Sequence, residues 1–208
     1  MSKKVLLSTH ASSVTAAAQV ILNGGVIVYP TETIYGLGAN ALSVEAVERV
    51  FEIKQRDKSN PILVLIPGEE SLDQLVMEIP EVARALMKFF WPGPLTLVFK
   101  AAPGVSPILT ANTGKIGVRL SSNEFCTKLL DICKIPITST SANISGGPNP
   151  TSVERINHSI KDVVDLVIDG GVLESGKPST VVDVSSGDVR LLREGVISFD
   201  EIIGRLAL

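Results

Sequence analysis

The chain has 208 residues, of which 45% are hydrophobic and 20% are charged, and its formal net charge is −3. This composition is typical of a compact globular protein and excludes an intrinsically disordered chain, which lacks apolar residues and carries a high net charge. The acidic balance argues against a protein that coats nucleic acid nonspecifically, because such binding depends on Lys and Arg.

The N-terminal segment 1–7 contains two lysines followed by a short apolar run. That run is too short for a signal peptide, and no later run approaches the roughly 18 apolar residues that span a bilayer. We therefore expect a cytoplasmic protein that makes no contact with a membrane.

In the first third of the chain, helical and strand-like patterns alternate. Apolar spacing predicts a helix over 12–23, stopped by Gly24 and Gly25, and a buried strand over 26–29. A loop is expected over 30–40, then a helix over 43–55 with Ser43 as its N-cap, then a buried strand over 61–66.

Strands become more frequent in the remainder of the chain. Helices are predicted over 69–77, 80–90, 124–133 and 198–206, and strands over 94–100, 116–120, 135–140, 163–168, 180–184 and 189–192. A polar loop is expected over 141–151. This order predicts one α/β domain spanning 1–208, with helices flanking a mixed parallel and antiparallel sheet.

The two cysteines do not form a disulfide in this reading. Cys126 and Cys133 are seven residues apart in a predicted helix, so their Cα atoms would lie about 10 Å apart, beyond the roughly 7 Å that a disulfide allows. Neither His10 nor His158 lies near them in sequence. We therefore expect two core thiols and no resident metal site.

Two polar loops beside predicted strands are candidates for chemistry. In the loop after the first buried strand, Gly36 and Gly38 would allow a ligand to approach the backbone, although a plain strand-to-helix turn is the alternative. Before the next strand, Lys54, Arg56 and Lys58 would neutralise phosphates. Their alternative role is to stabilise a helix C-terminus.

Two further features point to anion binding. Hydroxyl residues and an Asn crowd the segment 136–150 at the end of a predicted strand. Arg119 lies within an apolar strand, where an Arg is costly unless it is paired, and Arg193 lies in another. A substrate carboxylate or phosphate would satisfy Arg119, and so would an internal acidic partner.

One apparent nucleotide motif is rejected. The segment 171–177 (GVLESGK) matches a phosphate-binding P-loop, but Pro178 stands where Ser or Thr is required. The residues after it predict a strand and not the helix that a P-loop precedes.

Together these loops resemble the YrdC-like threonylcarbamoyl-AMP synthases. The matching stretches, in the family's order, are 29–40 (YPTETIYGLGAN), 54–61 (KQRDKSNP), 91–96 (WPGPLT), 117–120 (GVRL), 138–146 (TSTSANISG), 179–183 (STVVD) and 192–195 (LREG). Each is short, but their joint occurrence across nearly the whole chain is highly specific. In length the chain resembles the short single-domain members.

The resemblance implies a twisted mixed sheet with a concave, positively lined cleft. It also implies a nucleotidyltransferase, an L-threonylcarbamoyladenylate synthase that joins L-threonine, bicarbonate or CO2, and ATP with Mg²⁺, and releases pyrophosphate. A separate transferase would then move the threonylcarbamoyl group onto an adenosine of tRNA.

Site residues follow from the resemblance position by position. The threonine contacts would be Thr33, Arg119 and Ser139. The ATP contacts would be Lys54, Arg56, Asn60, Lys115, Ser141, Asn143, Asn149 and Arg193. No side chain is expected to act as a nucleophile, because positioning and charge neutralisation suffice. Leu65 stands where some members carry a His near the amino acid.

Three other functions are weighed against this one. Related domains adenylate other carbamoyl groups, but they normally belong to longer chains. A double-stranded RNA-binding module would use the same cleft, which the acidic net charge disfavours. A purely structural protein would not explain so many polar loops at strand ends.

Overall fold

The computed structural model describes residues 5–207, and its strands form two sheets. The first has the order β1-β9-β2-β3-β8, made of Val5–Leu7, Leu166–Asp169, Ile27–Tyr29, Gly36–Gly38 and Thr140–Ser141. The second has the order β11-β10-β5-β6-β4-β7, made of Arg190–Arg193, Thr180–Asp183, Leu95–Lys100, Lys115–Arg119, Val64–Leu65 and Ile137–Thr138. Both mix parallel and antiparallel pairs, so the mixed α/β class is confirmed.

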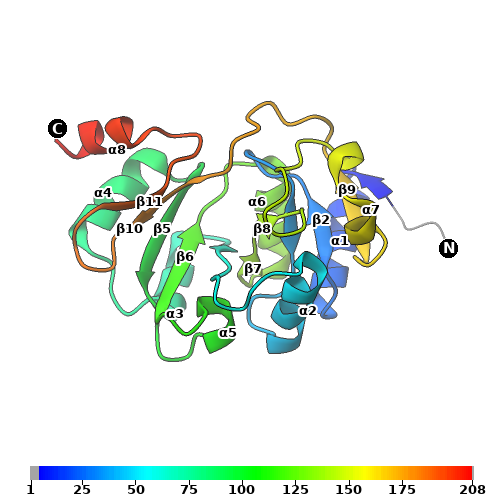
Figure 1. Cartoon of the computed structure of the whole chain (residues 1–208), viewed down its shortest axis with the longest axis horizontal. Coiled ribbons are helices and arrows are strands. Elements are labelled where there is room, and N and C mark those ends of the chain that lie inside the picture. Colours follow the sequence, from blue (N-terminus) through cyan, green and yellow to red (C-terminus); the bar gives the residue numbers. More distant parts are fainter. Residues whose placement is uncertain (1–4, 208) are drawn as a thin grey trace.

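The single sheet expected from the sequence is therefore divided in two, and the division falls at Ser139. β7 and β8 are consecutive in the chain but belong to different sheets. Between them, the backbone N–H of Ser139 donates to the carbonyl of Leu63 (2.8 Å), and that of Thr138 donates to the carbonyl of Ala39 (2.9 Å). The segment thus pairs with both sheets in turn and joins them into one body (Figure 1).

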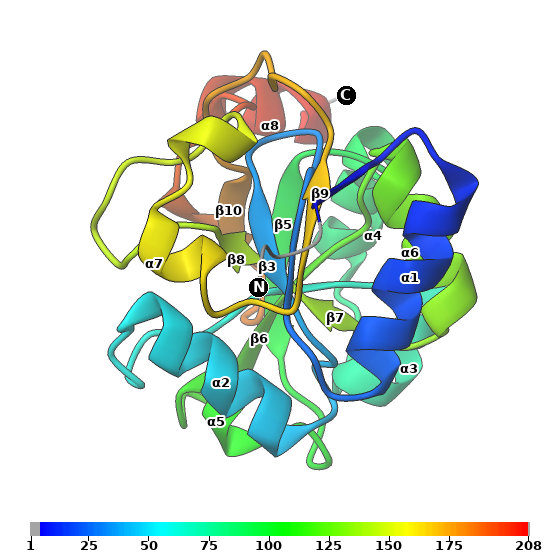
Figure 2. The ribbon, with the colours of Figure 1, turned by 90° about the vertical axis from the view of Figure 1, so that its right-hand side faces the viewer.

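Helices cover these sheets as the apolar patterns predict. The α-helices are α1 Ala11–Leu22, α2 Val44–Lys54, α3 Leu72–Leu75, α4 Glu81–Phe90, α5 Pro107–Thr110, α6 Glu124–Cys133, α7 His158–Lys161 and α8 Phe199–Leu206. Two short 3₁₀ turns are η1 Glu69–Ser71 and η2 Val153–Arg155. Figure 2 shows α1 and α6 side by side on one face of the first sheet, with α2 and α7 on the other.

Local signals explain where the longer helices begin. The Ser43 hydroxyl accepts a hydrogen bond from the backbone N–H of Ala46 (3.1 Å), which caps α2 as expected. The Asn123 side chain caps α6 in the same way. Both thiols, Cys126 and Cys133, are free and buried within α6.

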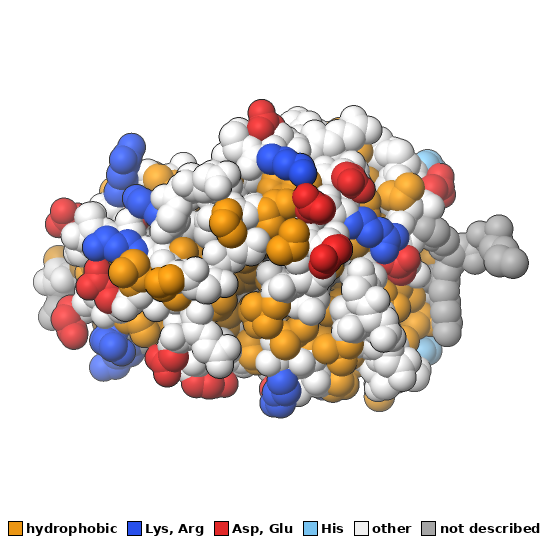
Figure 3. Space-filling model, turned by 90° about the horizontal axis from the view of Figure 1, so that it is seen from below, with side chains coloured by type: hydrophobic (Ala, Val, Ile, Leu, Met, Phe, Trp, Pro, Cys, Tyr) orange, Lys and Arg blue, Asp and Glu red, His pale blue; other side chains and the backbone are white. Residues whose placement is uncertain are grey.

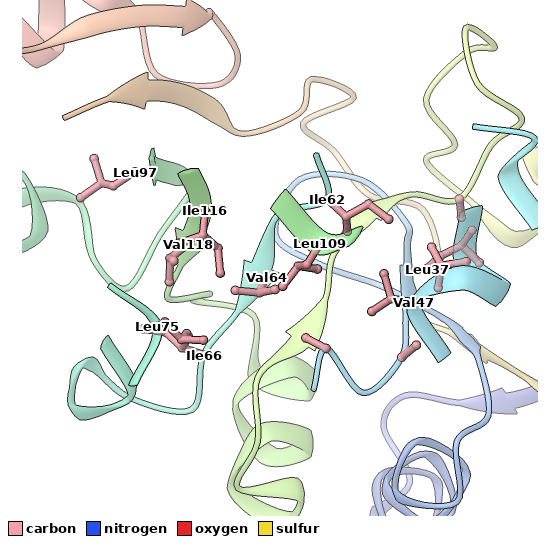
Figure 4. Packing of buried hydrophobic residues seen from close by; sticks show 14 of the residues in the cluster. Leu37, Val47, Ile62, Val64, Ile66, Leu75, Leu97, Leu109, Ile116 and Val118 are labelled. Carbon is pink, nitrogen blue, oxygen red and sulfur yellow. The ribbon is translucent and has the colours of Figure 1, made fainter. Parts of the chain in front are cut away.

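The core is continuous between the two sheets. Figure 4 shows Leu97, Ile116 and Val118 of the second sheet meeting Val64, Leu109 and Ile62, which in turn lie toward Leu37 and Val47. A second cluster lies beneath α1 and α6 and includes Tyr29, Leu65 and Phe125. A rigid, fully packed frame therefore supports the loops at the junction of the sheets.

Some element boundaries differ from the sequence-based expectation. The loop expected over 30–40 contains strand β3, and the helix expected over 69–77 is η1 followed by the four-residue α3. The strand expected over 61–66 is only two residues long, and β9 begins at Leu166, three residues after its expected start. Strand β1 and the short helices α5 and α7 were not anticipated. Among the described residues, no helix combines the length and apolar character needed to cross a bilayer.

Candidate active site

A cavity of about 370 Å³ lies where the two sheets meet. Its floor is one face of β5, β6 and β10, and loops from the first sheet form its wall. The predicted residues that line it are Thr33, Arg56, Lys115, Arg119, Ser139, Ser141, Asn149 and Arg193. The other lining residues include Thr31, Leu63, Thr96, Val98, Gly117, Ser179, Val181, Asp183 and Leu192.

Arg119 at the end of β6 is the most buried cation that lines the cavity. Its side chain is only 3% exposed, yet its partners are few: Nη1 lies 3.4 Å from Thr33 Oγ1 and 3.5 Å from Glu32 Oε1. Within residues 5–207, neither Arg119 Nε nor Glu32 Oε1 has a hydrogen-bond partner. An internal acid thus compensates the charge of Arg119 in part, while hydrogen-bonding capacity of the guanidinium remains unused.

The loop between β2 and β3 is shaped by Thr31. Its hydroxyl accepts from the backbone N–H groups of Thr33 (3.1 Å) and Ile34 (3.2 Å) and donates to the carbonyl of Ile34 (2.7 Å). This turn brings the Thr33 hydroxyl to 2.9 Å from that of Thr31 and directs it toward Arg119. Both threonines line the cavity.

Lys54 has a different position from the phosphate-facing one that the sequence suggests. It is the last residue of α2, only 1% exposed, and it does not line the cavity. Its ammonium donates to the carbonyl of Ser141 and to the carbonyl (2.8 Å) and Oδ1 (2.9 Å) of Asn143. Burial and the charge of Arg56 lower the pKa of Lys54 to about 7. Lys54 therefore anchors the turn that carries Ser141.

Asn143 completes the same turn from within. Its Oδ1 accepts from the Ser141 hydroxyl (2.7 Å), and its Nδ2 donates to the carbonyls of Gly147 (2.6 Å) and Pro148 (3.2 Å). Asn143 does not line the cavity, whereas Ser141 and Asn149 on either side of it do. Its contacts shape the hydroxyl-rich loop.

Arg56 is held at the cavity by the backbone that follows it. Its Nε donates to the carbonyl of Asn60 (3.1 Å), and its Nη2 donates to that of Pro61 (2.9 Å). The side chain of Asn60 is exposed and does not line the cavity, so Asn60 contributes its backbone. Burial lowers the pKa of Arg56 from its ordinary value.

Arg193 on β11 brings a third guanidinium to the cavity. Its Nη2 donates to the carbonyl of Ser179 (2.9 Å). Burial, and then the nearby charges of Arg119 and Arg56, lower the pKa of Arg193. Three arginines that repel one another in a partly buried cavity provide a strong binding site for an anion.

Lys115 and Asp183 lie at another part of the cavity. Lys115 Nζ is 2.7 Å from Asp183 Oδ2, and Asp183 Oδ1 accepts from the backbone N–H of Ser185 (2.9 Å). Burial alone would raise the pKa of Asp183, but its hydrogen bonds and the charge of Lys115 lower it overall. The pair is thus ionised and carries no net charge.

The sequence reasoning did not assign Thr96, Ser179 or Asp183 as site residues. Ser179 and Thr96 share a hydrogen bond between their hydroxyls (2.9 Å) on the cavity floor. Ser179 and Asp183 belong to the quoted stretch 179–183 and Thr96 closes the stretch 91–96, so these two motifs were the available signal. The P-loop rejection is confirmed, because strand β10 follows the segment 171–177.

The comparisons with known proteins agree with this geometry. The family model Sua5_yciO_yrdC, described as "Telomere recombination", matches residues 19–195. A threonylcarbamoyl-AMP synthase of Pyrococcus abyssi is 42% identical over 89% of this chain and 55% of that protein. One of Bacillus subtilis is 37% identical over 94% of this chain and 57% of that protein.

A solved structure extends the likeness to three dimensions. The crystal structure of P. abyssi Sua5 complexed with L-threonine superposes with a TM-score of 0.94 at 38% identity, covering 98% of this chain and 61% of that one. The chain spans just over half the length of the two curated relatives. By its family match, its identity to these relatives and its fold, the chain belongs to the Sua5/YciO/YrdC family.

Proposed function

We propose that this protein is an L-threonylcarbamoyladenylate synthase, a nucleotidyltransferase that joins L-threonine, bicarbonate or CO2, and ATP. The observation that carries the proposal is the set of three arginines around one cavity, of which Arg119 is buried with hydrogen-bonding capacity unused. An amino acid carboxylate and a triphosphate are the two anions that this reaction must hold together.

The amino acid would bind at the Arg119 end. A planar guanidinium binds a carboxylate with two parallel hydrogen bonds, and the hydroxyls of Thr33 and Ser139 line the same cavity. The P. abyssi Sua5 structure is a complex with L-threonine, which supports this amino acid as the ligand. Arg56 and Arg193 would then neutralise the phosphates.

The chemistry needs positioning more than a reactive side chain. The threonine amine attacks CO2 and loses a proton, which gives a carbamate. A carbamate oxygen then attacks the α-phosphorus of ATP, the bond to the β-phosphate oxygen breaks, and pyrophosphate leaves. Arginines that face both anions reduce their repulsion and stabilise the charge that develops on the leaving group.

Mg²⁺ would enter with ATP and be held by phosphate oxygens and water. The described part of the chain has no group of three His, Cys, Asp or Glu side chains that could hold a metal. Among residues 5–207, Asp183 is the one carboxylate that lines the cavity, and it is already paired with Lys115. We therefore assign no protein ligand to the ion.

The product would pass to a separate transferase that acts on tRNA, a role that fits a cytoplasmic protein. A cavity of about 370 Å³ is within the size range of small-molecule sites. The net charge of −3 disfavours tight binding of double-stranded RNA. The face of the molecule shown in Figure 3 has acidic and basic side chains interspersed among apolar ones and no basic stripe.

The test is pyrophosphate release from ATP with bicarbonate and Mg²⁺, measured with L-threonine, with L-serine and without an amino acid. We expect release that depends on threonine, together with threonylcarbamoyl-AMP detected by mass spectrometry. Release with another carbamoyl donor but not with threonine would replace this function with another carbamoyl adenylation. No release with any donor would refute an adenylating enzyme.

A further inference from the structure

Glu32 is a carboxylate on the loop between β2 and β3 that lies next to the cavity without lining it. Its side chain is only 13% exposed, and its Oε1 lies 3.5 Å from Nη1 of Arg119. Thr33, the next residue of the loop, lines the cavity and lies 3.4 Å from the same Nη1. The loop therefore presents a hydroxyl to the cavity and a carboxylate behind it, both within reach of one guanidinium.

The carboxylate of Glu32 is held in place by the start of a helix. The Ser121 hydroxyl donates a hydrogen bond to Oε2 of Glu32 and accepts one from the backbone N–H of Asn123 (3.2 Å). Asn123 in turn caps α6, and Ser121 is buried. One oxygen of Glu32 is thus fixed to the frame of the fold, and the other, Oε1, is left beside Arg119.

The electrostatic surroundings of Arg119 favour a partner of this kind. Arg56 and Arg193 line the same cavity. Burial, and then the charges of Arg119 and Arg56, lower the pKa of Arg193, so the guanidinium groups repel one another. Among residues 5–207, Glu32 is the one acid that forms an ion pair with Arg119. Glu32 therefore opposes the displacement of Arg119 by the other two arginines.

The pair leaves hydrogen-bonding capacity for a ligand. Neither Glu32 Oε1 nor Arg119 Nε has a hydrogen-bond partner among the described residues. A guanidinium has five N–H donors and can meet two carboxylates along different edges. One edge can face Glu32 behind the cavity wall, while another faces a carboxylate within the cavity.

We propose that Glu32 is a positioning residue for carboxylate binding by Arg119. It holds the guanidinium from the side away from the cavity, so that the edge facing the cavity meets a carboxylate with two hydrogen bonds. Glu32 itself contacts no substrate, because it does not line the cavity. The inference rests on the proposed function, since that function supplies the amino acid carboxylate.

The test is calorimetric titration of L-threonine into the wild type, Glu32→Gln, Arg119→Met and the double variant. The glutamine oxygen can still accept from Ser121, so Glu32→Gln should fold, but no charge remains to hold Arg119. We expect threonine affinity to fall about tenfold, since misplacing a contact by about 1 Å can cost roughly 100-fold. With Arg119→Met already in place, Glu32→Gln should weaken it no further, because no guanidinium is left to position. Glu32→Asp keeps the charge and should recover part of the loss.

Two readouts distinguish positioning from a general loss of structure. In the pyrophosphate assay, Glu32→Gln should raise the KM for threonine while kcat and the KM for ATP stay within about twofold of the wild type. NMR relaxation of the Arg119 Nε–H group, assigned by its absence in Arg119→Met, should show a rigid side chain in the wild type and a mobile one in Glu32→Gln. The matched control is Glu78→Gln, which removes an acid paired with Lys100 (2.9 Å) outside the cavity and should behave as the wild type.

Three results would overturn the inference. They are unchanged threonine affinity in Glu32→Gln, an equal loss from Glu32→Gln with and without Arg119, and no binding of threonine to the wild type. Threonine binding that follows the expected pattern without pyrophosphate release would refute the proposed synthase and leave the role of Glu32 standing.

Discussion

Replacing Arg119 and Glu32 together should distinguish the effect of Arg119 on substrate binding from its effect on stability. In Arg119→Met the substrate loses a bidentate, charge-assisted contact, which costs about 3–4 kcal/mol, or roughly a 100- to 1,000-fold weaker threonine affinity. The same change removes the counter-charge of Glu32, whose side chain is only 13% exposed. Breaking a buried pair costs about 3 kcal/mol of unfolding free energy.

The double variant Arg119→Met with Glu32→Gln tests the reasoning. A neutral glutamine still meets the Ser121 hydroxyl, which now contacts Glu32 Oε2, and it leaves no unpaired charge. We expect urea unfolding to show most of the stability restored, while calorimetry shows threonine affinity still as low as in the single variant. Threonine binding at wild-type strength in the stable double variant would refute the carboxylate assignment.

Three further changes test individual contacts. Lys54→Met should lower the unfolding free energy by about 3 kcal/mol in urea, because the backbone carbonyls of Ser141 and Asn143 lose their donor. Burial and the charge of Arg56 lower the pKa of Lys54 to about 7 in the folded chain. Between pH 7 and 10 the unfolded chain therefore keeps a proton on Lys54 that the folded chain has lost. Wild-type stability should therefore rise with pH in this window, by up to about 1.4 kcal/mol per unit, and urea titrations of Lys54→Met should lack this component. Tyr35→Phe removes the hydroxyl that bridges two backbone groups after β9, and should cost about 1–3 kcal/mol in thermal unfolding. Gly195→Ala would place a Cβ against the backbone of Ser179, and should cost about 1–3 kcal/mol and raise the KM for ATP in the pyrophosphate assay.

Sequence patterns predicted the helices and strands whose positions depend on neighbouring residues in the chain. The N-cap of α2 and the apolar strand before the first loop follow directly from neighbouring residues. Strand β3 does not, because Gly36 and Gly38 have poor strand propensity. The strand needs glycine there: a Cβ at Gly38 would lie 2.7 Å from Tyr29 Cε1, on the strand with which it pairs. This requirement for glycine can be recognised only when the position of the partner strand is known.

The candidate site likewise contains some residues that the sequence predicted and others that depend on long-range pairing. Polar residues at strand ends predicted the cavity wall, because strand ends gather at one edge of a sheet. The stretch from Lys54 to Arg56 was read as one phosphate-binding unit, yet residues two apart at a helix end do not face the same way. Lys54 accordingly lies beneath the turn after β8, and Arg56 faces the cavity. The place of Asp183 beside Lys115 depends on the pairing of β10 with β5 and of β5 with β6, which no local pattern contains.

Two buried cations in this protein show why charge alone does not identify a binding residue. Lys54 and Arg119 are 1% and 3% exposed, and sequence reasoning assigned both to substrates. The three protons of Lys54 Nζ meet three oxygens of one turn, so the group has no donor left for a ligand. Arg119 meets one hydroxyl and one carboxylate at 3.4–3.5 Å, and its Nε has no partner among the described residues. A buried donor without a partner costs stability, and a bound carboxylate would offset that cost. Unused hydrogen-bonding capacity, more than positive charge, therefore makes Arg119 the stronger candidate for substrate binding, whereas Lys54 supports the turn that carries Ser141.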